Sequence, residues 1–194
     1  MKPGARALGV AESYRDEPGR TREGCRSTVA GAVVRADRVF DGLEYQRCTV
    51  GGTDATTAVR RLVDELGRPD VRYLLLGAVA PAWYNVLDLS RLHEVAQRPV
   101  IAVTFEASTG LEAGLEDAFS GGELEQRLET YRALPERRPV SVNDETVYVR
   151  SVGIEPEDAD VVVRAFTPEG GRPEPIRVAR QAARAADSYA SSLE

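Results

Sequence analysis

The spacing of apolar residues divides the first half of the chain into short strands and one helix. Residues 8–10 predict a first strand. Two β-rich runs, residues 27–34 and 39–50, flank a short polar stretch, which predicts a hairpin. Apolar residues then recur at helical spacing over residues 59–66, and Gly67 ends the predicted helix.

The second half alternates strands and helices. The continuous apolar run at residues 71–79 predicts a strand buried on both faces. A helix is predicted to begin at Asn85, with Val86, Leu89, Leu92 and Ala96 inward. The remaining predictions are a strand at residues 99–104, helical residues 111–134 across a Gly121–Gly122 break, a strand or hairpin at 140–152, and helices at 157–166 and 175–189.

This order predicts an α/β fold. Three strands come first, and the later strands are each reached through a helix. Such an order fits a mixed sheet, in which an antiparallel trio is extended by parallel strands through helical crossovers. A chain of 194 residues can bury one well-formed core. We expect one domain over residues 1–194.

Composition places the chain among globular proteins, with 42% apolar residues and mixed charge. No apolar run is long enough to span a membrane, and residues 1–6 lack the apolar core of a signal peptide. We therefore expect a cytoplasmic protein without membrane contact. Cys25 and Cys48 are too few for a disulfide scaffold. In a hairpin symmetric about residues 36–37 the two thiols would lie opposite each other, and we interpret them as small core or strand residues.

The charge pattern points to a local binding site. The net charge is −6, and the basic residues are 24 arginines and Lys2. An acidic balance almost without lysine suggests a halophile or a GC-rich genome. It argues against nonspecific duplex binding, which depends on cationic side chains. The arginine-rich residues 15–26 and 132–138 could supply a local nucleic-acid site, or could be solvated loops and helix ends.

Six short segments follow one another in a recognisable order: residues 9–14, 41–43, 50–56, 76–79 with 85–88, 98–100 and 173–179. Together they resemble one archaeal family, the endonuclease dU family, which is related to endonuclease V within the RNase H-like fold. The resemblance extends from about residue 6 to about residue 190. It implies an endonuclease that acts at deaminated bases in DNA, deoxyuridine above all, with Mg²⁺ or Mn²⁺ as cofactor.

The acids that the resemblance implies are missing. A metal-dependent nuclease needs carboxylates that converge from different strands, because Mg²⁺ takes oxygen ligands. The expected positions fall on Ala11, Gly51 and Gly77, and none of these can bind a metal through its side chain. We therefore expect impaired or lost catalysis.

Neighbouring acids are the catalytic and metal-binding candidates. Glu12 follows Ala11, but consecutive strand residues point to opposite faces, so Glu12 reaches the lost site only if the strand slips or bulges. Asp54 lies three residues after Gly51, where its alternative role is at a helix N-terminus. Asp88 is the third candidate ligand, and with Asn85 it resembles a helix cap.

Other residues are candidates for substrate binding. Backbone N–H groups at Gly51–Gly52 could meet a phosphate, although glycines also simply turn a chain. Trp83 and Tyr84 could stack on an extruded base or could cover the sheet edge. The full candidate set is Tyr14, Gly52, Thr53, Trp83, Tyr84 and Asn85.

Two further residues have structural explanations. Asp41–Gly42 is interpreted as a turn or bulge in the hairpin. His93 is the single histidine and would have to be the base of any nucleophilic triad, but its position beside an apolar stripe favours a partly buried edge residue.

Three functions stay open at this point. The first is an endonuclease acting on DNA that contains deaminated bases. The second is a non-catalytic relative that binds nucleic acid or protein on the same fold. The third is a small-anion-binding regulatory protein, for which the Gly51–Gly52 turn is the motif.

Overall fold

The computed structural model describes residues 1–14 and 25–192, and the loop predicted at residues 15–24 lies outside this part of the chain. Within it, seven strands form one mixed sheet with the order β3-β2-β1-β4-β5-β7-β6. The strands are β1 (Arg6–Ser13), β2 (Arg26–Arg35), β3 (Phe40–Thr49), β4 (Val71–Leu76), β5 (Val100–Thr104), β6 (Arg138–Val142) and β7 (Glu145–Val152). The helices are α1 (Ala55–Leu66), α2 (Pro81–Tyr84), α3 (Leu89–Ala96), α4 (Glu112–Ala118), α5 (Gly121–Arg132), α6 (Pro156–Ala165) and α7 (Glu174–Ser191).

The predicted mixed sheet is confirmed. β1 pairs antiparallel with β2, and β2 pairs antiparallel with β3. On its other side β1 pairs parallel with β4, which pairs parallel with β5. β6 and β7 form an antiparallel hairpin that adds to β5, so the hairpin alternative for the region after residue 140 is the correct one.

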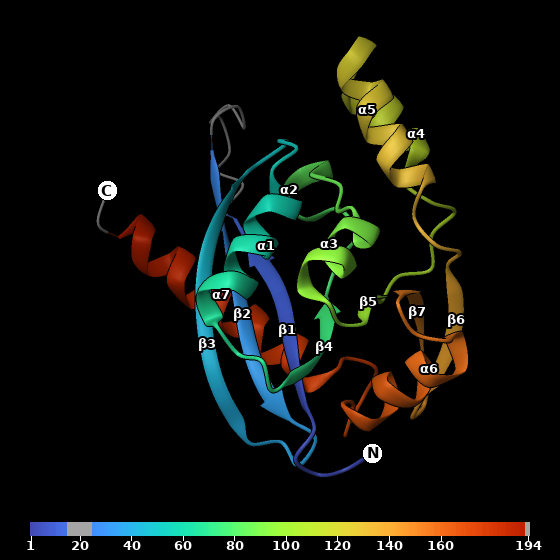
Figure 1. Ribbon diagram of the computed structural model, residues 1–194. Helices are drawn as coiled ribbons and strands as arrows, with labels where there is room; N and C mark the ends of the chain where they lie inside the picture. The colour runs from blue at the N-terminus through green and yellow to red at the C-terminus, as the bar shows by residue number, and fades with distance from the viewer. Residues whose placement is uncertain (15–24, 193–194) are drawn as a thin grey trace.

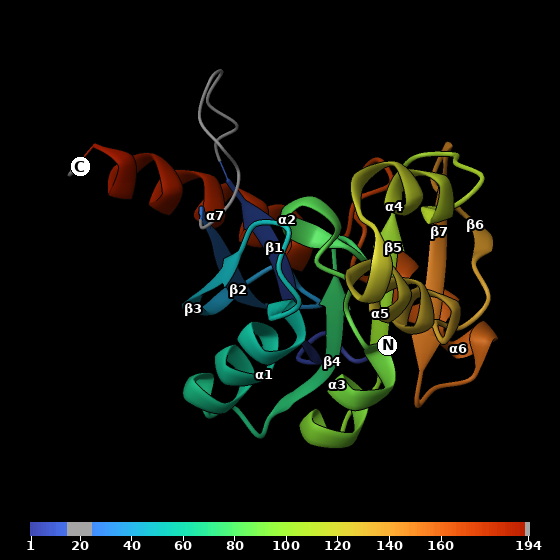
Figure 2. The ribbon, with the colours of Figure 1, turned by 90° about the horizontal axis from the view of Figure 1, so that it is seen from above.

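Helices cover both faces of the sheet. α1 and α3 lie on one face, and α7 crosses the other (Figure 1, Figure 2). The β4 strand contributes to both cores, because Leu74 and Leu76 pack with α1 and α3 whereas Leu75 packs with α6 and the start of α7. This double burial explains the continuous apolar run in the sequence.

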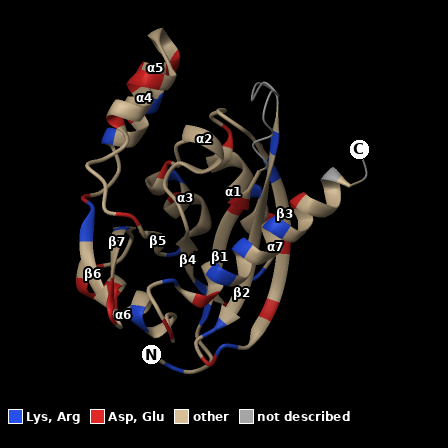
Figure 3. Ribbon diagram, turned by 180° about the vertical axis from the view of Figure 1, so that it is seen from behind, with Lys and Arg blue, Asp and Glu red and all other residues tan. Residues whose placement is uncertain are grey.

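Gly9 lets α7 lie directly on β1. A Cβ atom at this position would lie 2.1 Å from the carbonyl carbon of Pro175 and 2.5 Å from the backbone nitrogen of Ile176. A side chain there would overlap the backbone of the first turn of α7, so only glycine permits this approach. As a result, α7 crosses the sheet over β1 and β2, with several basic residues along its length (Figure 3).

β1 is longer than the predicted residues 8–10, and the boundaries on either side of the turn after β4 also differ from the prediction. β4 ends at Leu76 rather than at residue 79, and α3 begins at Leu89 rather than at Asn85. The residues between them form a tight turn that is held by tertiary hydrogen bonds, which periodicity cannot reveal. The predicted helical region 111–134 is two helices, α4 and α5. Among the described residues, no helix has the length and apolar character needed to cross a membrane.

The cysteine thiols do not lie opposite each other. Cys48 pairs with Ser27, and the Val50 N–H group donates to the carbonyl of Cys25. Two shifts separate this register from the symmetric one. Val34 pairs with Phe40, because the turn lies slightly later in the chain, and Asp41 is an extra residue in β3, between the pairs that Val33 and Val34 make. The bulge interpretation of Asp41 is therefore confirmed. Burial raises the pKa of the Cys48 thiol to about 12, so this thiol is inert near neutral pH.

Candidate functional site

A cavity of about 340 Å³ opens where β1 and β4 end, beside α7. Ligands of open α/β sheets commonly bind outside the carboxyl ends of parallel strands. We call this cavity the α7 cleft. Its lining includes Glu12 and Tyr14 at the end of β1, Gly77 and Ala78 after β4, and Arg172, Arg180 and Arg184 at α7.

Two of the positions where the family implies an acid meet at the floor of the cleft. The Gly77 N–H group donates to the Val10 carbonyl across 3.0 Å. A Cβ atom at Gly77 would lie 3.9 Å from the Cβ atom of Ala11, so acids at these positions would be neighbours. The same atom would lie 2.8 Å from Cγ2 of Ile176. An apolar side chain of α7 thus occupies the room that a carboxylate at position 77 would need.

Gly51, the third position where the family implies an acid, is not among the residues that line the α7 cleft. Gly51 has a φ angle of 69°, and a Cβ atom there would lie 2.6 Å from the ring of Trp83. Glycine is therefore required by both backbone conformation and packing.

The residues present do not fit a divalent metal ion. In the described parts of the chain, no three histidine, cysteine, aspartate or glutamate side chains come close enough to hold one. Glu12 is the one carboxylate among the residues that line the α7 cleft. Mg²⁺ is bound through carboxylates in a near-ideal octahedron. The candidates Glu12, Asp54 and Asp88 do not converge into such a set.

Glu12 has a structural role in the sheet. The pairing of β1 with β2 runs through Glu12 and Ser13 without a register shift, so Glu12 points away from the face of Ala11. One carboxylate oxygen accepts a hydrogen bond from the Ala82 N–H group at 3.0 Å, and the other accepts from the Ser27 hydroxyl. Glu12 thus joins β1 to β2 and α2.

The turn that Glu12 holds is left-handed. Ala82, Trp83 and Tyr84 have φ angles of 48°, 54° and 60°. For residues with a Cβ atom this conformation costs roughly 1–2 kcal/mol each. Two hydrogen bonds of Ala82 offset the cost, since its N–H group donates to Glu12 and its carbonyl accepts from the Gly51 N–H group at 2.8 Å.

Asp54, which is partly exposed, and the buried Asn85 connect two loops. The Asp54 carboxylate accepts from the Thr49 N–H group at 2.9 Å and from the Asn85 amide at 2.8 Å. Asn85 is fully buried, and its amide oxygen accepts from the Ala55 N–H group at 2.9 Å. Asn85 therefore caps α1 instead of α3. Burial alone would raise the pKa of Asp54, but the hydrogen bonds from Thr49 and Asn85 outweigh it and lower that pKa.

The variant Asp54→Asn is expected to lower the free energy of unfolding by about 1–3 kcal/mol at pH 7, because the amide nitrogen that replaces Oδ2 cannot accept from the hydroxyl and N–H groups of Thr49. The folded-state pKa is depressed, so the carboxylate stabilises the fold above the unfolded pKa of about 3.9. That contribution disappears as pH falls through the folded pKa. Urea unfolding at neutral and strongly acidic pH measures both effects, with exposed Asp64→Asn as the control. Unchanged stability at pH 7 would contradict the structural role.

The Gly51–Gly52 turn has already used its backbone donors. The Gly51 N–H group donates to Ala82, and the Gly52 N–H group donates to the Thr49 carbonyl at 3.0 Å. The buried guanidinium of Arg127 donates to the Gly51 carbonyl. Thr53 is exposed at the tip of this turn. We therefore place no anion at Gly52 and Thr53.

Trp83 and Tyr84 pack beneath α4 and α5. Their rings and that of Phe119 form one cluster, with centroid separations of 5.1 Å for Trp83 and 6.2 Å for Tyr84. The guanidinium carbon of Arg127 lies 3.8 Å from the centroid of the Phe119 ring. Neither Trp83 nor Tyr84 lines the α7 cleft, whereas Tyr14 does. The arrangement favours the packing interpretation of Trp83 and Tyr84 over base stacking.

Two structural interpretations are confirmed. Asp88 is the N-cap of α3, and its carboxylate accepts from the Arg91 N–H group at 2.9 Å. His93 is partly buried, and its Nδ1 lies 2.9 Å from the carbonyl oxygen of Arg98.

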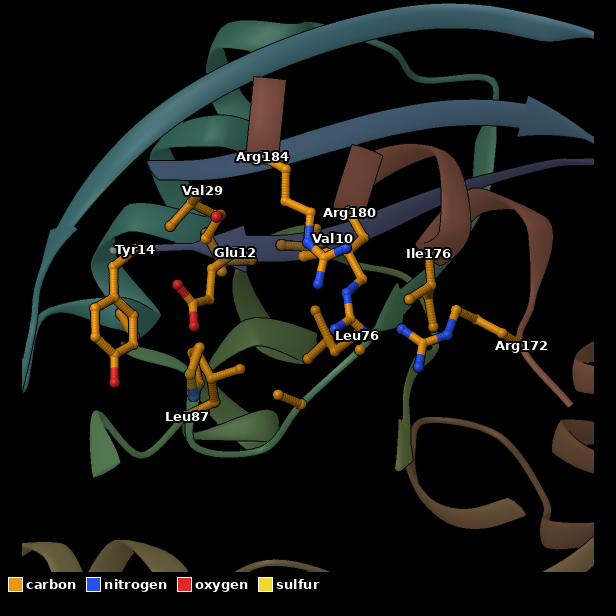
Figure 4. A pocket seen from close by; sticks show the side chains of 17 residues that line it. Val10, Glu12, Tyr14, Val29, Leu76, Leu87, Arg172, Ile176, Arg180 and Arg184 are labelled. Carbon is orange, nitrogen blue, oxygen red and sulfur yellow. The ribbon is translucent and has the colours of Figure 1, made fainter. Parts of the chain in front are cut away.

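Arginines dominate the charge of the α7 cleft. The guanidinium groups of Arg172, Arg180 and Arg184 point into the cavity (Figure 4). Burial lowers the pKa of Arg172, and the neighbouring charges of Arg180 and Arg184 lower it further. Across the described ranges, none of the three has an ion-pair partner. A chain with a net charge of −6 thus keeps three cations at one site, where Arg180 and Arg184 repel the positive charge of Arg172. An anionic ligand would relieve this repulsion.

The sequence carried a signal for this cluster that composition alone did not expose. Arg180 and Arg184 are one helical turn apart and flank a buried stripe that includes Ile176, Ala179 and Ala183. Of the arginine-rich segments considered from the sequence, residues 15–24 lie outside the described part of the chain, and Arg26 lies 3.7 Å from Asp54. In the segment 132–138, Arg132 pairs with Glu112 at 2.9 Å, whereas Arg137 lines a second cavity beside the α7 cleft.

Comparisons with known proteins agree with this fold. A model of the family described as endonuclease dU matches residues 3–187. A UPF0215 protein of Pyrobaculum calidifontis is 34% identical over 186 residues, covering 95% of this chain and 98% of that protein. A UPF0215 protein of Methanopyrus kandleri is 33% identical over 183 residues, covering 92% and 89%.

Solved structures show the same fold. A protein of unknown function from Archaeoglobus fulgidus has a TM-score of 0.80 at 22% identity, covering 94% of this chain and 98% of its own. Endonuclease V of Bacillus subtilis has a TM-score of 0.63 at 10% identity, covering 97% and 83%. Endonuclease V of Ciona intestinalis, in complex with DNA containing an inosine, has a TM-score of 0.61 at 12% identity, covering 98% and 87%. The fold is thus endonuclease V-like and RNase H-like.

Proposed function

Because the chain belongs to the endonuclease dU family, we propose that it binds nucleic acid in the α7 cleft without cleaving it. Family membership and the endonuclease V-like fold support a nuclease-related function. The observation that carries the proposal is the charge of the α7 cleft, which is positive where the family resemblance implies acids. Where acids are expected, Ala11 and Gly77 meet, and the same cavity is lined by three arginines that form no ion pair within the described residues.

Arginines suit this task because guanidinium groups bind phosphate oxygens through paired hydrogen bonds. A phosphate between Arg172, Arg180 and Arg184 would neutralise charges that now repel one another. Cleavage has no comparable support, since metal-assisted hydrolysis needs ions that activate water and stabilise the leaving oxygen. Such ions would require ligands that the described residues do not bring together.

DNA containing a deaminated base is the first ligand to test. The family description names deoxyuridine, and the Ciona neighbour is in complex with DNA containing inosine. We therefore choose single-stranded and duplex DNA with one deoxyuridine or one deoxyinosine, and the same strands without it.

The expected result is binding of end-labelled DNA in EDTA, with no cleavage product when Mg²⁺ or Mn²⁺ is added. Binding should not need a metal, because the contacts come from arginine side chains. Fluorescence anisotropy measures the affinity, and denaturing gels measure cleavage. A nuclease that cuts the same strands is the positive control.

Metal-dependent cleavage that disappears in Glu12→Gln would contradict the non-catalytic proposal and would show a rebuilt active site at Glu12. An absence of binding to every strand, in low salt, would contradict the nucleic-acid proposal itself.

A further inference from the structure

A second cavity adjoins the α7 cleft on the side of β5. Its volume is about 330 Å³, and it shares Gly77, Ala78, Arg172 and Arg180 with the α7 cleft. We call it the β5-side hollow. Because the two cavities share these residues, one extended ligand can occupy both.

The β5-side hollow combines aromatic rings with guanidinium groups. The Arg137 guanidinium carbon lies 3.7 Å from the centroid of the Tyr148 ring, and that of Arg172 lies 4.0 Å from the centroid of Phe105. Arg150 lies over the Tyr131 ring at 5.5 Å. All six of these residues line the cavity.

Two of these guanidinium groups are held in place by hydrogen bonds to uncharged oxygens. Arg137 donates to the carbonyl of Ser108 at 2.9 Å and to that of Glu106. Arg150 donates to the Pro135 carbonyl and, at 3.4 Å, to the Tyr131 hydroxyl. Within the described residues neither forms an ion pair, so their positive charges stay available to an anion.

We propose that the β5-side hollow binds unpaired bases of a single strand whose backbone continues from the α7 cleft. This inference rests on the proposed function and names its substrate class. Unstacked bases bind aromatic rings and arginine planes, and the backbone follows the basic groove. A duplex keeps its bases stacked inside, so it cannot present base faces to Tyr148 or Arg137.

The test compares strands of two lengths by fluorescence anisotropy. We expect a thymidine dinucleotide, with its single phosphate, to bind in the α7 cleft, and a thymidine decamer to reach both cavities. Tyr148→Leu is expected to weaken decamer binding about tenfold, since one stacking contact is lost. It should leave the dinucleotide affinity unchanged. Tyr45→Leu removes an exposed tyrosine from the edge strand β3 and should change neither affinity.

Arg137→Gln is a second variant, for the case that Tyr148→Leu does not fold. It should also lower the affinity for the decamer and leave the affinity for the dinucleotide unchanged. Equal decamer affinity in the parent and in folded Tyr148→Leu and Arg137→Gln would overturn the inference. A matched duplex that binds as tightly and loses as much affinity in the variants would overturn it as well. Failure of the proposed function is distinct, because the parent would then bind neither the dinucleotide nor the decamer.

Discussion

Replacing Arg180 and Arg184 together by glutamine is expected to weaken binding of single-stranded DNA on the order of 100-fold at low salt. Each guanidinium can make charge-assisted hydrogen bonds to a phosphate, and such bonds contribute about 1.5–3 kcal/mol. Both side chains line the α7 cleft, and neither has an ion-pair partner in the described residues. Their loss therefore removes ligand contacts without breaking a salt bridge of the fold.

The salt dependence gives a second readout of the same variant. Each phosphate contact to a single strand contributes about 0.7 to the slope of log affinity against log salt. Losing two contacts should flatten that slope by about 1.4. Anisotropy titrations over a series of potassium chloride concentrations measure both the affinity and the slope.

The matched control is Arg60→Gln with Arg177→Gln. It changes the net charge by the same amount, and both residues are exposed and paired with acids, Asp64 at 3.0 Å and Glu174 at 2.5 Å. Parent-like affinity is expected in this control. Equal weakening in both double variants would mean that overall charge, rather than the α7 cleft, governs binding.

The sequence predicted most of the fold because the relevant signals are local. Alternation and helical spacing identified the order of strands and helices, and the buried run before Gly77 identified the central strand. The turn at residues 81–84 escaped prediction. Its left-handed residues carry no periodic signal, and they are held by Glu12 and Gly51, which lie far away in sequence. Tertiary contacts override local preference there.

The candidate site was predicted from what is missing. The resemblance placed expected acids at Ala11 and Gly77, and the structure makes these positions neighbours. The arginines could not be assigned in the same way. Arg137, Arg150 and Arg172 are separated by many residues, and their convergence depends on the pairing of β5 with β7 and on the path of α7. The sequence held two local signals, the spacing of Arg180 and Arg184 and the arginine-rich segment 132–138, which contains Arg137.

Asp54 and Asn85 illustrate a different limit. Their residue types suggested helix capping, which is correct for Asn85 but with another helix than expected. Asn85 caps α1, which precedes it by 30 residues. The Asp54 carboxylate binds Thr49 and Asn85 and makes no side-chain hydrogen bond to α1. Side-chain capping within one helix follows from sequence spacing, whereas capping between elements depends on how loops pack together.

Gly9→Ala is expected to destabilise the fold by about 3 kcal/mol or more. The new methyl group would lie 2.1 Å from the carbonyl carbon of Pro175, and backbone atoms cannot move aside as a flexible side chain can. Overpacked sites usually cost about 1–3 kcal/mol, and this contact with backbone belongs at the upper end. Urea unfolding monitored by circular dichroism measures the change. Gly4→Ala is the matched control, because a Cβ atom at Gly4 meets nothing within 4 Å.

The same substitution links the fold to the proposed function. The variant can keep its sheet only if the start of α7 moves away from β1, and that movement carries Arg172, Arg180 and Arg184 out of the cleft. Folded Gly9→Ala protein should therefore bind single-stranded DNA more weakly than Gly4→Ala protein, under conditions where both are native by circular dichroism. If folded Gly9→Ala protein bound DNA as tightly as the parent, the close contact between α7 and β1 would not be what positions the arginines.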